Sequence, residues 1–404
     1  MTAGIIIVGG GQAAASAVVK LRELDNAIPI TMVCGEGVLP YQRPPLSKKY
    51  LSGEMPLERL VLRPQEWFDD HNVTVKLGAR VEAIHRDEKS VTLFDGETLA
   101  YDKLLLATGS QLRFLPVPMG GRLKGVHYIR CSLDADAMRP DMKTGNKLVV
   151  IGGGYIGLEV SAIAAQMGMK VTVVEMADRI LQRVAAPDTS DYIRELHRRN
   201  GVTIIEGVGL SKLTERDGKV GAAELTDCTH LDADIVLAGI GVMPNSELGA
   251  SAGLALQSGI TVDAFCQTSD ADIYAAGDCA SFDFHGENIR LESVPNAINQ
   301  AEIAAVNMLG DVVPYVATPW FWSDQYDVKL QIAGLNTGYD STLVRAGKRE
   351  GAQSVWYYKG DKLLAVDAMN DAPSFMMARR IIEANKSVPK DVAADATSNL
   401  KEWT

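Results

Sequence analysis

Two glycine-rich stretches of this sequence have the spacing that binds the pyrophosphate of a dinucleotide. They read GGGQAA at residues 9–14 and GGGYIG at residues 152–157, each with the order glycine, any residue, glycine, any two residues, small residue. The first glycine permits a tight turn, the second leaves bare backbone for the phosphates, and the third small residue lets helix and strand pack closely. The helix N-terminus then faces the phosphates. One copy is weak evidence, whereas two copies predict two dinucleotide sites.

Acidic residues follow both stretches at distances that suit a ribose. Glu175 ends the segment VTVVE, 21 positions after Gly154 (175 minus 154), where a carboxylate accepts the ribose hydroxyls of NADH and repels the extra phosphate of NADPH. Arg179 lies close enough in the sequence to weaken this preference. After the first stretch, Glu36 is the ribose candidate, and the alternative is a solvated loop acid.

The two stretches differ in the dinucleotide that they favour. The second carries the signature of NADH, and the first suits FAD. A nicotinamide beside a flavin implies hydride transfer to flavin N5, with the chemistry supplied by the cofactors and the orientation supplied by the protein.

Alternating strand and helix patterns surround both stretches. An apolar strand, an amphipathic helix and a second apolar strand form one βαβ unit, and the same pattern restarts at Lys147 after about 140 residues. A further helix is expected from Ser293, as N-cap, with Pro295 in its first turn. From about Thr318 the sequence changes to aromatic, alternating strands, and a last helix precedes a polar tail.

The bulk composition is that of an ordinary globular chain with more than one domain. Its 404 residues exceed a single hydrophobic core, which stops growing near ~250–300 residues. A net charge of −11 argues against the basic face that nucleic acid requires. The chain enters its first strand without a basic leader, and its most apolar stretch is too short for a bilayer, so we expect a cytoplasmic protein with no membrane contact.

The cysteines are few and scattered. No two of them are close enough in the sequence to form a zinc site or a redox disulfide, and an odd, dispersed set fits a reducing cytosol. We expect no metal site. The five residues are Cys34, Cys131, Cys228, Cys266 and Cys279.

Several longer motifs resemble the pyridine nucleotide-disulfide oxidoreductase superfamily. These are GGGYIGLE, LLLATGS, AGIGVMPN and AAGDCA, and finer features, PYQRPPLSKKYL, ESVPNAINQA and PWFWSDQY, are similar to the NADH-dependent ferredoxin reductases of cytochrome P450 and Rieske-type oxygenase systems. The match runs from about residue 4 to about residue 385, and the tail carries no recognisable motif.

The resemblance implies an α/β fold in which two Rossmann-like nucleotide-binding domains, arranged as in glutathione reductase, are joined by a C-terminal α+β domain. Residues 1–110 and 247–318 would form the FAD domain, residues 111–246 the NAD domain, and residues 319–404 the C-terminal interface domain.

Other chemistry of this superfamily is excluded by missing residues. A disulfide reductase needs a close cysteine pair after the first βαβ unit and a histidine near the C-terminus. Residues 35–60 contain no cysteine, and the last histidine is His285. NADH oxidases and peroxidases that depend on a cysteine in the same region fit poorly for the same reason. The remaining interpretation is a flavin that passes electrons directly to an outside acceptor.

The resemblance gives individual residues roles. Lys48 matches a lysine beside flavin N5, Glu159 an acid that pairs with it near the nicotinamide, and Trp322 a tryptophan near the isoalloxazine that shares a strand face with Trp320. The structural alternatives are a solvated lysine for Lys48, an acid favoured only by the helix dipole for Glu159, and ordinary core aromatics for the tryptophans. The FAD residues are Gly9, Gly11, Ala13, Ala14, Glu36, Arg43, Pro45, Lys48, Val81, Ala107, Thr108, Gly109, Arg130, Gly277, Asp278, Val294 and Trp322, and the NAD residues are Gly152, Gly154, Tyr155, Ile156, Gly157, Glu159, Glu175 and Gly241.

The implied activity is electron transfer from NADH through FAD to a [2Fe–2S] ferredoxin, which supplies a cytochrome P450 or a Rieske oxygenase. Because the chain is acidic, a local basic patch would have to attract an acidic ferredoxin. Two alternatives stay open: reduction of another acceptor, such as rubredoxin, a quinone or an organic radical, and an NADH-responsive flavoprotein binding module. The candidate basic residues are Arg290, Lys329, Arg345, Lys348 and Arg349, and for any single one of them an ordinary solvated surface charge is the favoured alternative.

Overall fold

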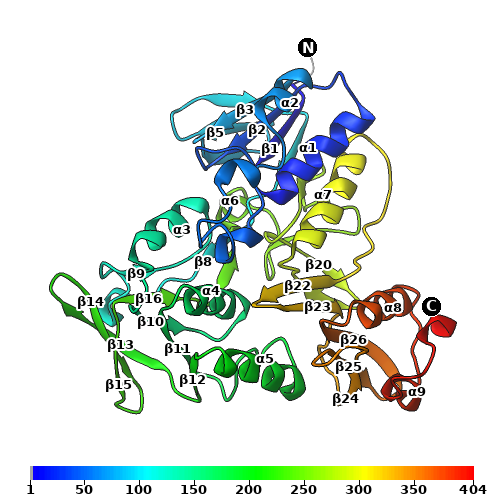
Figure 1. Cartoon of the computed structure of the whole chain (residues 1–404). Coiled ribbons are helices and arrows are strands. Elements are labelled where there is room, and N and C mark those ends of the chain that lie inside the picture. Colours follow the sequence, from blue (N-terminus) through cyan, green and yellow to red (C-terminus); the bar gives the residue numbers. More distant parts are fainter. Residues whose placement is uncertain (1–2) are drawn as a thin grey trace. The chain divides into compact units, whose positions relative to one another are not determined.

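The computed structural model describes residues 3–404, so the first two residues of the predicted FAD domain lie outside the described part of the chain. Two compact units make up this part (Figure 1). Unit 1 contains the chain up to residue 42, residues 57–111 and residues 242–319, and unit 2 contains residues 43–56, 112–241 and 320–404. Each unit has one five-stranded parallel sheet, which confirms the α/β class that the two βαβ patterns predict.

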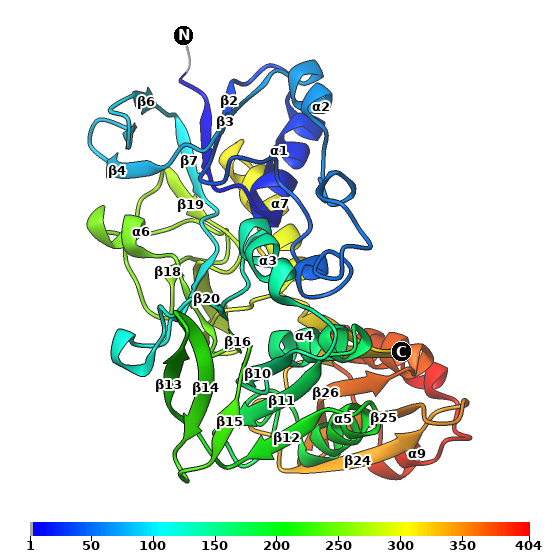
Figure 2. The ribbon, with the colours of Figure 1, turned by 60° about the vertical axis from the view of Figure 1, so that its left-hand side comes forward.

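The parallel sheet of unit 1 has the strand order β19-β7-β1-β2-β3. Strand β1 is apolar and buried throughout, and β7 is apolar and buried after Lys103, as expected for parallel strands covered on both faces. Helices α1 and α7, far apart in the sequence, lie side by side in both views (Figures 1 and 2). Ser293 caps α7 by accepting a hydrogen bond from the Asn296 backbone N–H, as predicted. The elements are β1 (Ile5–Val8), α1 (Gln12–Leu24), β2 (Ile30–Cys34), β3 (Val73–Leu77), β7 (Lys103–Leu106), β19 (Ile273–Ala275) and α7 (Val294–Met308).

Smaller elements complete unit 1. Two three-stranded sheets have the orders β4-β5-β6 and β18-β20-β21, and β8 pairs with β17. The elements are η2 (Leu57–Arg59), α2 (Gln65–Asp70), β4 (Val81–His85), β5 (Ser90–Leu93), β6 (Thr98–Ala100), β8 (Ser110–Leu112), β17 (Val242–Pro244), α6 (Glu247–Ser251), β18 (Ile260–Thr261), β20 (Ala280–Phe284) and β21 (Glu287–Ile289).

The parallel sheet of unit 2 repeats the pattern of unit 1 with the order β12-β11-β10-β16-β9. A three-stranded antiparallel sheet, β13-β14-β15, adjoins it through β14 and β16. The elements are η3 (Val117–Met119), β9 (Val126–His127), α3 (Ser132–Met138), η4 (Arg139–Asp141), β10 (Lys147–Ile151), α4 (Tyr155–Gln166), β11 (Lys170–Glu175), α5 (Pro187–Arg199), β12 (Thr203–Glu206), β13 (Leu210–Arg216), β14 (Lys219–Leu225), β15 (His230–Asp232) and β16 (Ile235–Ala238).

An antiparallel sheet forms the C-terminal part of unit 2. Its order is β22-β23-β26-β25-β24, and α8 packs against β26 and β23 (Figure 1). The polar tail packs against the C-terminal sheet, because Val388, Ala393 and Leu400 are buried in the same cluster as Trp356. The elements are β22 (Trp320–Gln325), β23 (Val328–Gly334), β24 (Ser341–Ala346), β25 (Gln353–Lys359), β26 (Lys362–Met369), α8 (Ala372–Glu383), α9 (Lys390–Ala394) and η5 (Leu400–Trp403).

Residues 43–56, which include most of the motif PYQRPPLSKKYL, belong to unit 2 and contain a short 3₁₀ helix, η1 (Pro44–Ser47). Prolines open this helix because they have no N–H to donate there. Helix η1 packs against α4 and against α3. In the described residues we find no helix with the length and apolar character needed to cross a membrane.

Candidate functional site

The glycines of the second cradle, residues 152–157, leave no space for side chains. A Cβ atom on Gly152, whose φ is +107°, would lie 2.4 Å from the Gly239 carbonyl oxygen. A Cβ atom on Gly157 would lie 2.3 Å from the Gly152 carbonyl oxygen. By contrast, nothing lies within 4 Å of the position of a Cβ atom on Gly154. The backbone is therefore packed at the first and third positions and open at the second, where a pyrophosphate must approach.

Glu175 ends β11 beside this cradle, as the sequence predicts. Its Oε2 accepts a hydrogen bond of 2.7 Å from the Gly153 backbone N–H, and its Oε1 accepts one of 2.8 Å from the Ala177 N–H. These two contacts fix a carboxylate at the edge of the cradle, with lone pairs left for ribose hydroxyls.

Tyr155 and Ile156 begin α4, directly after the cradle. The side chain of Ile156 is exposed, whereas the Tyr155 hydroxyl is buried with no hydrogen-bond partner among the described residues. Burial raises the pKa of Tyr155, so the phenol stays protonated, and its ring lies 4.9 Å from the Phe321 ring between centroids. The remaining predicted NAD residue, Gly241, adopts a φ of +101° after β16.

Lys48 and Glu159 form a buried ion pair, with 2.6 Å between Nζ and Oε2. The side chains are 16% and 5% exposed. The Ser47 hydroxyl donates to the same carboxylate oxygen at 2.5 Å, and the Ser323 hydroxyl donates to Oε1 at 2.7 Å. The structure therefore brings together the lysine and the acid that the resemblance pairs, from the end of η1 and from α4, and adds two serine donors that sequence reasoning missed.

A chain of buried hydrogen bonds continues from Ser323 to α5. The Gln325 amide nitrogen donates to the Ser323 hydroxyl at 3.1 Å, and the Gln325 oxygen lies 2.8 Å from Nε2 of His197. His197 is fully buried, and this burial lowers its pKa, so its ring is neutral at pH 7 and donates from Nε2 to the amide oxygen. The sequence contains a signal for this series of hydrogen bonds, because Ser323 and Gln325 are polar residues at alternate positions of one strand. Both face the interior.

The first cradle, residues 9–14, is also closed to a side chain at its first glycine. Gly9 has a φ of +144°, and a Cβ atom there would lie 2.1 Å from the Ala107 carbonyl oxygen. Ala13 and Ala14 are buried at the start of α1, after Gly11 as N-cap. Gly277 also reaches this helix start, because a Cβ atom built on it would lie 3.2 Å from Cβ of Ala13. Unit 1 therefore gathers the predicted glycines and small residues around one turn.

Other predicted FAD residues of unit 1 are held by specific contacts. Glu36 accepts a hydrogen bond of 2.7 Å from the Tyr41 hydroxyl, and Asp278 accepts one of 2.9 Å from Ser110. The Thr108 hydroxyl donates to the Asn245 carbonyl at 2.7 Å. Beside it, Gly109 has a φ of +70°, and Val294 is the first residue of α7.

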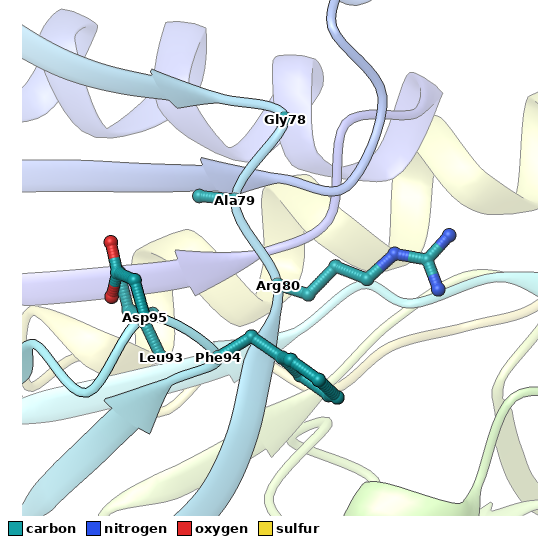
Figure 3. A pocket seen from close by; sticks show the side chains of 6 residues that line it. All are labelled: Gly78, Ala79, Arg80, Leu93, Phe94 and Asp95. Carbon is teal, nitrogen blue, oxygen red and sulfur yellow. The ribbon is translucent and has the colours of Figure 1, made fainter.

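A small pocket of about 110 Å³ lies next to Val81 in unit 1 (Figure 3). Its lining comes from the segment that joins β3 to β4 and from the end of β5, and the side chains of Arg80 and Asp95 point to opposite sides. A Cβ atom built on Gly35, the residue before Glu36, would lie 3.6 Å from Cγ of Arg80. Arg80 therefore lies close to the segment that contains the predicted ribose acid Glu36. It is a candidate dinucleotide-binding residue that sequence reasoning missed. The lining residues are Gly78, Ala79, Arg80, Leu93, Phe94 and Asp95.

The predicted FAD residues Arg43, Pro45, Arg130 and Trp322 belong to unit 2. An Arg43 guanidinium nitrogen donates to the Arg130 carbonyl at 2.8 Å, so these two arginines are neighbours. Pro45 lies within η1. Trp322 and Trp320 lie on one face of β22, with 5.6 Å between ring centroids, as the alternation predicts.

Two of the candidate basic docking residues are not free surface charges. Arg345 is 6% exposed and donates to backbone carbonyls of the tail, so its assignment to a surface patch was wrong. Arg290 donates to the Asp278 carbonyl at 3.0 Å and pairs with Glu292 at 2.7 Å. Lys329, Lys348 and Arg349 are exposed, and their part in docking stays a prediction.

Comparison with known families decides the classification. The model of the pyridine nucleotide-disulphide oxidoreductase family matches residues 3–301, and that of the reductase C-terminal family matches residues 320–404. The chain belongs to the pyridine nucleotide-disulphide oxidoreductase family. The second match includes the tail, so the expectation that the likeness ends near residue 385 was wrong. This family binds FAD and NAD(H).

Curated relatives place the chain among the ferredoxin reductases. It is 42% identical to rhodocoxin reductase of Rhodococcus erythropolis over 399 residues, which cover 98% of this chain and 93% of the relative. It is also 42% identical to putidaredoxin reductase of Pseudomonas putida, with 98% and 96% covered. A rubredoxin–NAD(+) reductase of Pseudomonas putida is 36% identical, with 91% and 95% covered.

Solved structures agree with this classification. The covalent complex of putidaredoxin reductase with putidaredoxin contains a chain with a TM-score of 0.95 and 41% identity, covering 99% of this chain and 97% of that one. The ferredoxin reductase for the CYP199A2 system from Rhodopseudomonas palustris also has a TM-score of 0.95, with 38% identity and 98% of both chains covered.

The residues present fit the two cofactors of the family. Each cradle is closed to side chains at its first glycine, and the second also offers open backbone and a fixed carboxylate. The chemistry of the donors therefore suits one dinucleotide in each unit, and the assignment of Glu175 and Glu36 as ribose acids stays a prediction.

Proposed function

We propose that this protein oxidises NADH and delivers the electrons singly, through FAD, to a [2Fe–2S] ferredoxin that supplies a cytochrome P450 or a Rieske-type oxygenase. The observation that carries the proposal is the pair of glycine cradles, each too crowded for a side chain at its first position, in a chain that resembles ferredoxin reductases along its whole length. The cytoplasmic location stays a prediction from the scattered cysteines.

The second cradle is the proposed site of NADH. Its open backbone at Gly154 and the N-terminus of α4 suit the pyrophosphate, and Glu175 suits the adenosine ribose. Tyr155, Ile156 and Gly241 are proposed to line the remainder of the nucleotide site. The Tyr155 hydroxyl has no hydrogen-bond partner in the described residues, so a polar group of a bound nucleotide or a water would satisfy it.

The first cradle is the proposed site of FAD, whose bound flavin accepts electrons in pairs and releases them one at a time. Glu36 is proposed to accept the ribose hydroxyls, and Asp278, oriented by Ser110, to accept hydrogen bonds from the ribityl chain. The N–H groups at the start of α7, from Val294 onward, give a partial positive charge. The other predicted FAD residues keep the same assignment.

Lys48 has the proposed role of stabilising negative charge on the reduced flavin, as the resemblance implies. Glu159 and the carbonyl of Pro44, which accepts from Lys48 at 3.2 Å, hold the ammonium in one position. Ser47 and Ser323 in turn hold the Glu159 carboxylate. These residues position a charge and do not need to act as an acid or a base.

A second acceptor deserves the same test, because a rubredoxin reductase is among the relatives. Rubredoxin also takes single electrons, so the residues that bind NADH and FAD would serve either partner. Only the residues of the docking surface would then distinguish ferredoxin from rubredoxin as the acceptor.

The test is anaerobic stopped-flow spectroscopy of the purified yellow protein. NADH is expected to bleach the flavin absorbance, and oxidised [2Fe–2S] ferredoxin is then expected to restore it in two one-electron steps. Rubredoxin, a quinone and dichlorophenolindophenol are offered in parallel. Bleaching without reoxidation by any ferredoxin, but with fast reoxidation by rubredoxin, would favour the second acceptor. A protein that cannot be loaded with flavin would contradict both.

A further inference from the structure

The loop after Glu175 contains an arginine whose side chain is tied to a buried serine. Arg179 donates from Nη1 to the Ser190 hydroxyl oxygen at 2.9 Å. Ser190 lies in the first turn of α5 with no exposed surface, and its hydroxyl donates to the Ile180 carbonyl at 2.8 Å. The serine hydroxyl therefore uses its proton on the loop backbone and offers its lone pair to the guanidinium.

The backbone of this loop is fixed by contacts that do not involve Ser190. The Ala177 N–H donates to Glu175 at 2.8 Å, and the Ile180 N–H donates to Glu206 at 2.8 Å. The Leu181 N–H donates to the Gly153 carbonyl at 3.0 Å. Of the two Ser190 contacts, the one with the Ile180 carbonyl involves the loop backbone. The other, the hydrogen bond from Arg179, sets the direction of the arginine side chain.

The position of Arg179 matters because an arginine close to the ribose acid changes which dinucleotide a Rossmann-type site accepts. A carboxylate at the end of the second strand selects NAD, whereas an arginine nearby accommodates the 2′-phosphate of NADP. This chain has both groups, Glu175 at the strand end and Arg179 four positions later. The preference between the two dinucleotides thus depends on where the guanidinium is held.

We propose that Ser190 is a specificity-determining positioning residue, which favours NADH over NADPH by holding the Arg179 guanidinium against α5. The inference rests on the proposed function in one respect, namely that Glu175 receives the ribose of a nicotinamide dinucleotide. It adds a residue that does not contact the nucleotide and acts through Arg179. Without the serine hydroxyl, Arg179 is released to pair with a 2′-phosphate.

The test substitutes Ser190 and measures both dinucleotides. In S190A, kcat/KM for NADPH is expected to rise about tenfold, the size of one charge-assisted hydrogen bond at an exposed ribose, chiefly through a lower KM. NADH remains the better substrate because Glu175 is unchanged. The gain with NADPH is expected to shrink as salt is raised from about 20 mM to about 300 mM, since it depends on an exposed charge pair.

A binding measurement separates recognition from turnover. Calorimetry with adenosine 2′,5′-bisphosphate and with 5′-AMP is expected to show a selective gain for the 2′-phosphorylated ligand in S190A. Because alanine leaves the Ile180 carbonyl without its donor, S190C is the second variant. It is nearly isosteric, and its thiol is a weak acceptor for the guanidinium.

The two arginines of the loop provide the matched control. Arg183 is exposed and lies in the same segment. The double variant S190A/R179Q is expected to lose the gain with NADPH, whereas S190A/R183Q is expected to keep it. Equal NADPH kinetics in S190A and S190A/R179Q would overturn the proposal, as would no gain in both S190A and S190C. Failure of the proposed function looks different, because wild-type flavin would then not be bleached by NADH.

Discussion

At the scale of single residues, three side chains contact the carboxylate of Glu159. Its carboxylate accepts from Lys48, Ser47 and Ser323 while only 5% of its side chain is exposed. A buried charge with these partners is stable, whereas a buried charge without its counter-ion is costly. The pair is therefore best tested by removing each charge alone and then both.

We expect E159Q to lower the stability of the protein by about 3 kcal/mol, the lower end for a broken buried pair, because the Lys48 ammonium keeps 16% exposure. K48M is expected to lower the stability by less than E159Q does, since two serine hydroxyls still donate to the Glu159 carboxylate. The double variant K48M/E159Q is expected to cost less than the sum of the two. Urea unfolding monitored by tryptophan fluorescence measures all three, and strictly additive costs would contradict the coupling.

The sequence predicted the charged members of this cluster and missed the neutral ones. Lys48 and Glu159 stand in motifs that the resemblance recognises, 111 positions apart (159 minus 48). Ser323 lies in a strand, and a serine on a strand is common. Its contact with Glu159 depends on how β22 packs against α4, and no local pattern contains that information.

At the scale of elements, a buried acid joins α5 to the C-terminal sheet of unit 2. Asp367 on β26 is fully buried and accepts from the Thr189 hydroxyl at 2.8 Å and from the Tyr357 hydroxyl. Tyr357 in turn accepts from the Ala186 backbone N–H at 2.9 Å. The start of α5 is thus fixed to two strands by one carboxyl group that has no cationic partner among the described residues.

Asp367 is expected to make the protein less stable as the pH rises. Burial raises its pKa from 3.8 to about 6, so the folded chain keeps a proton that the unfolded chain releases. Stability is therefore expected to fall by about 3 kcal/mol between about pH 4 and pH 6. In D367N, which can accept the same two hydroxyls through its amide oxygen, this fall is expected to disappear. Melting temperatures from pH 4 to 7 measure the effect, with D361N in an exposed turn as control; a parallel fall in D367N would disprove it.

The tail is a second element that depends on one side chain. Arg345 on β24 donates to the carbonyls of Ala393, Ala396 and Ser398 at 3.0, 3.2 and 3.1 Å. The sequence shows an arginine among other basic residues, which favours a surface charge. Only the folded tail provides the ring of carbonyls that a guanidinium fork satisfies and a lysine does not.

We expect R345K to loosen the tail at a cost of about 2–3 kcal/mol, because a single ammonium cannot replace the contacts of the fork. Hydrogen exchange of residues 390–404 is expected to accelerate, while exchange in the parallel sheet of unit 2 stays as in the wild type. The exposed Arg349 gives the matched control, R349K, which should change neither region. Unchanged protection of the tail in R345K would show that the apolar contacts of Val388, Ala393 and Leu400 hold it alone.

At the scale of the whole molecule, the sequence predicted the repeated βαβ pattern and the position of both cradles. These depend on local periodicity and on glycine spacing, which short segments contain. It did not predict that residues 43–56 and 320–404 group with the second parallel sheet, because this grouping depends on contacts between segments that are distant in the sequence. The sequence also predicts that no cysteine thiol lies on the electron route, which stays a prediction.

The last prediction concerns those thiols. Cys34, Cys266 and Cys279 are buried, and burial raises their pKa values, that of Cys34 to about 12, so they hold almost no thiolate at pH 7. Cys228 is exposed and Cys131 is half-buried. Iodoacetamide is therefore expected to label Cys228 first and to leave the rate of NADH-dependent reduction of an acceptor unchanged, both in the oxidised protein and after reduction by NADH. Peptide mass spectrometry identifies the labelled residues, and C228S accounts for any effect of that label. Inactivation that occurs only after reduction, together with alkylation of a buried cysteine, would place a thiol on the route of the electrons.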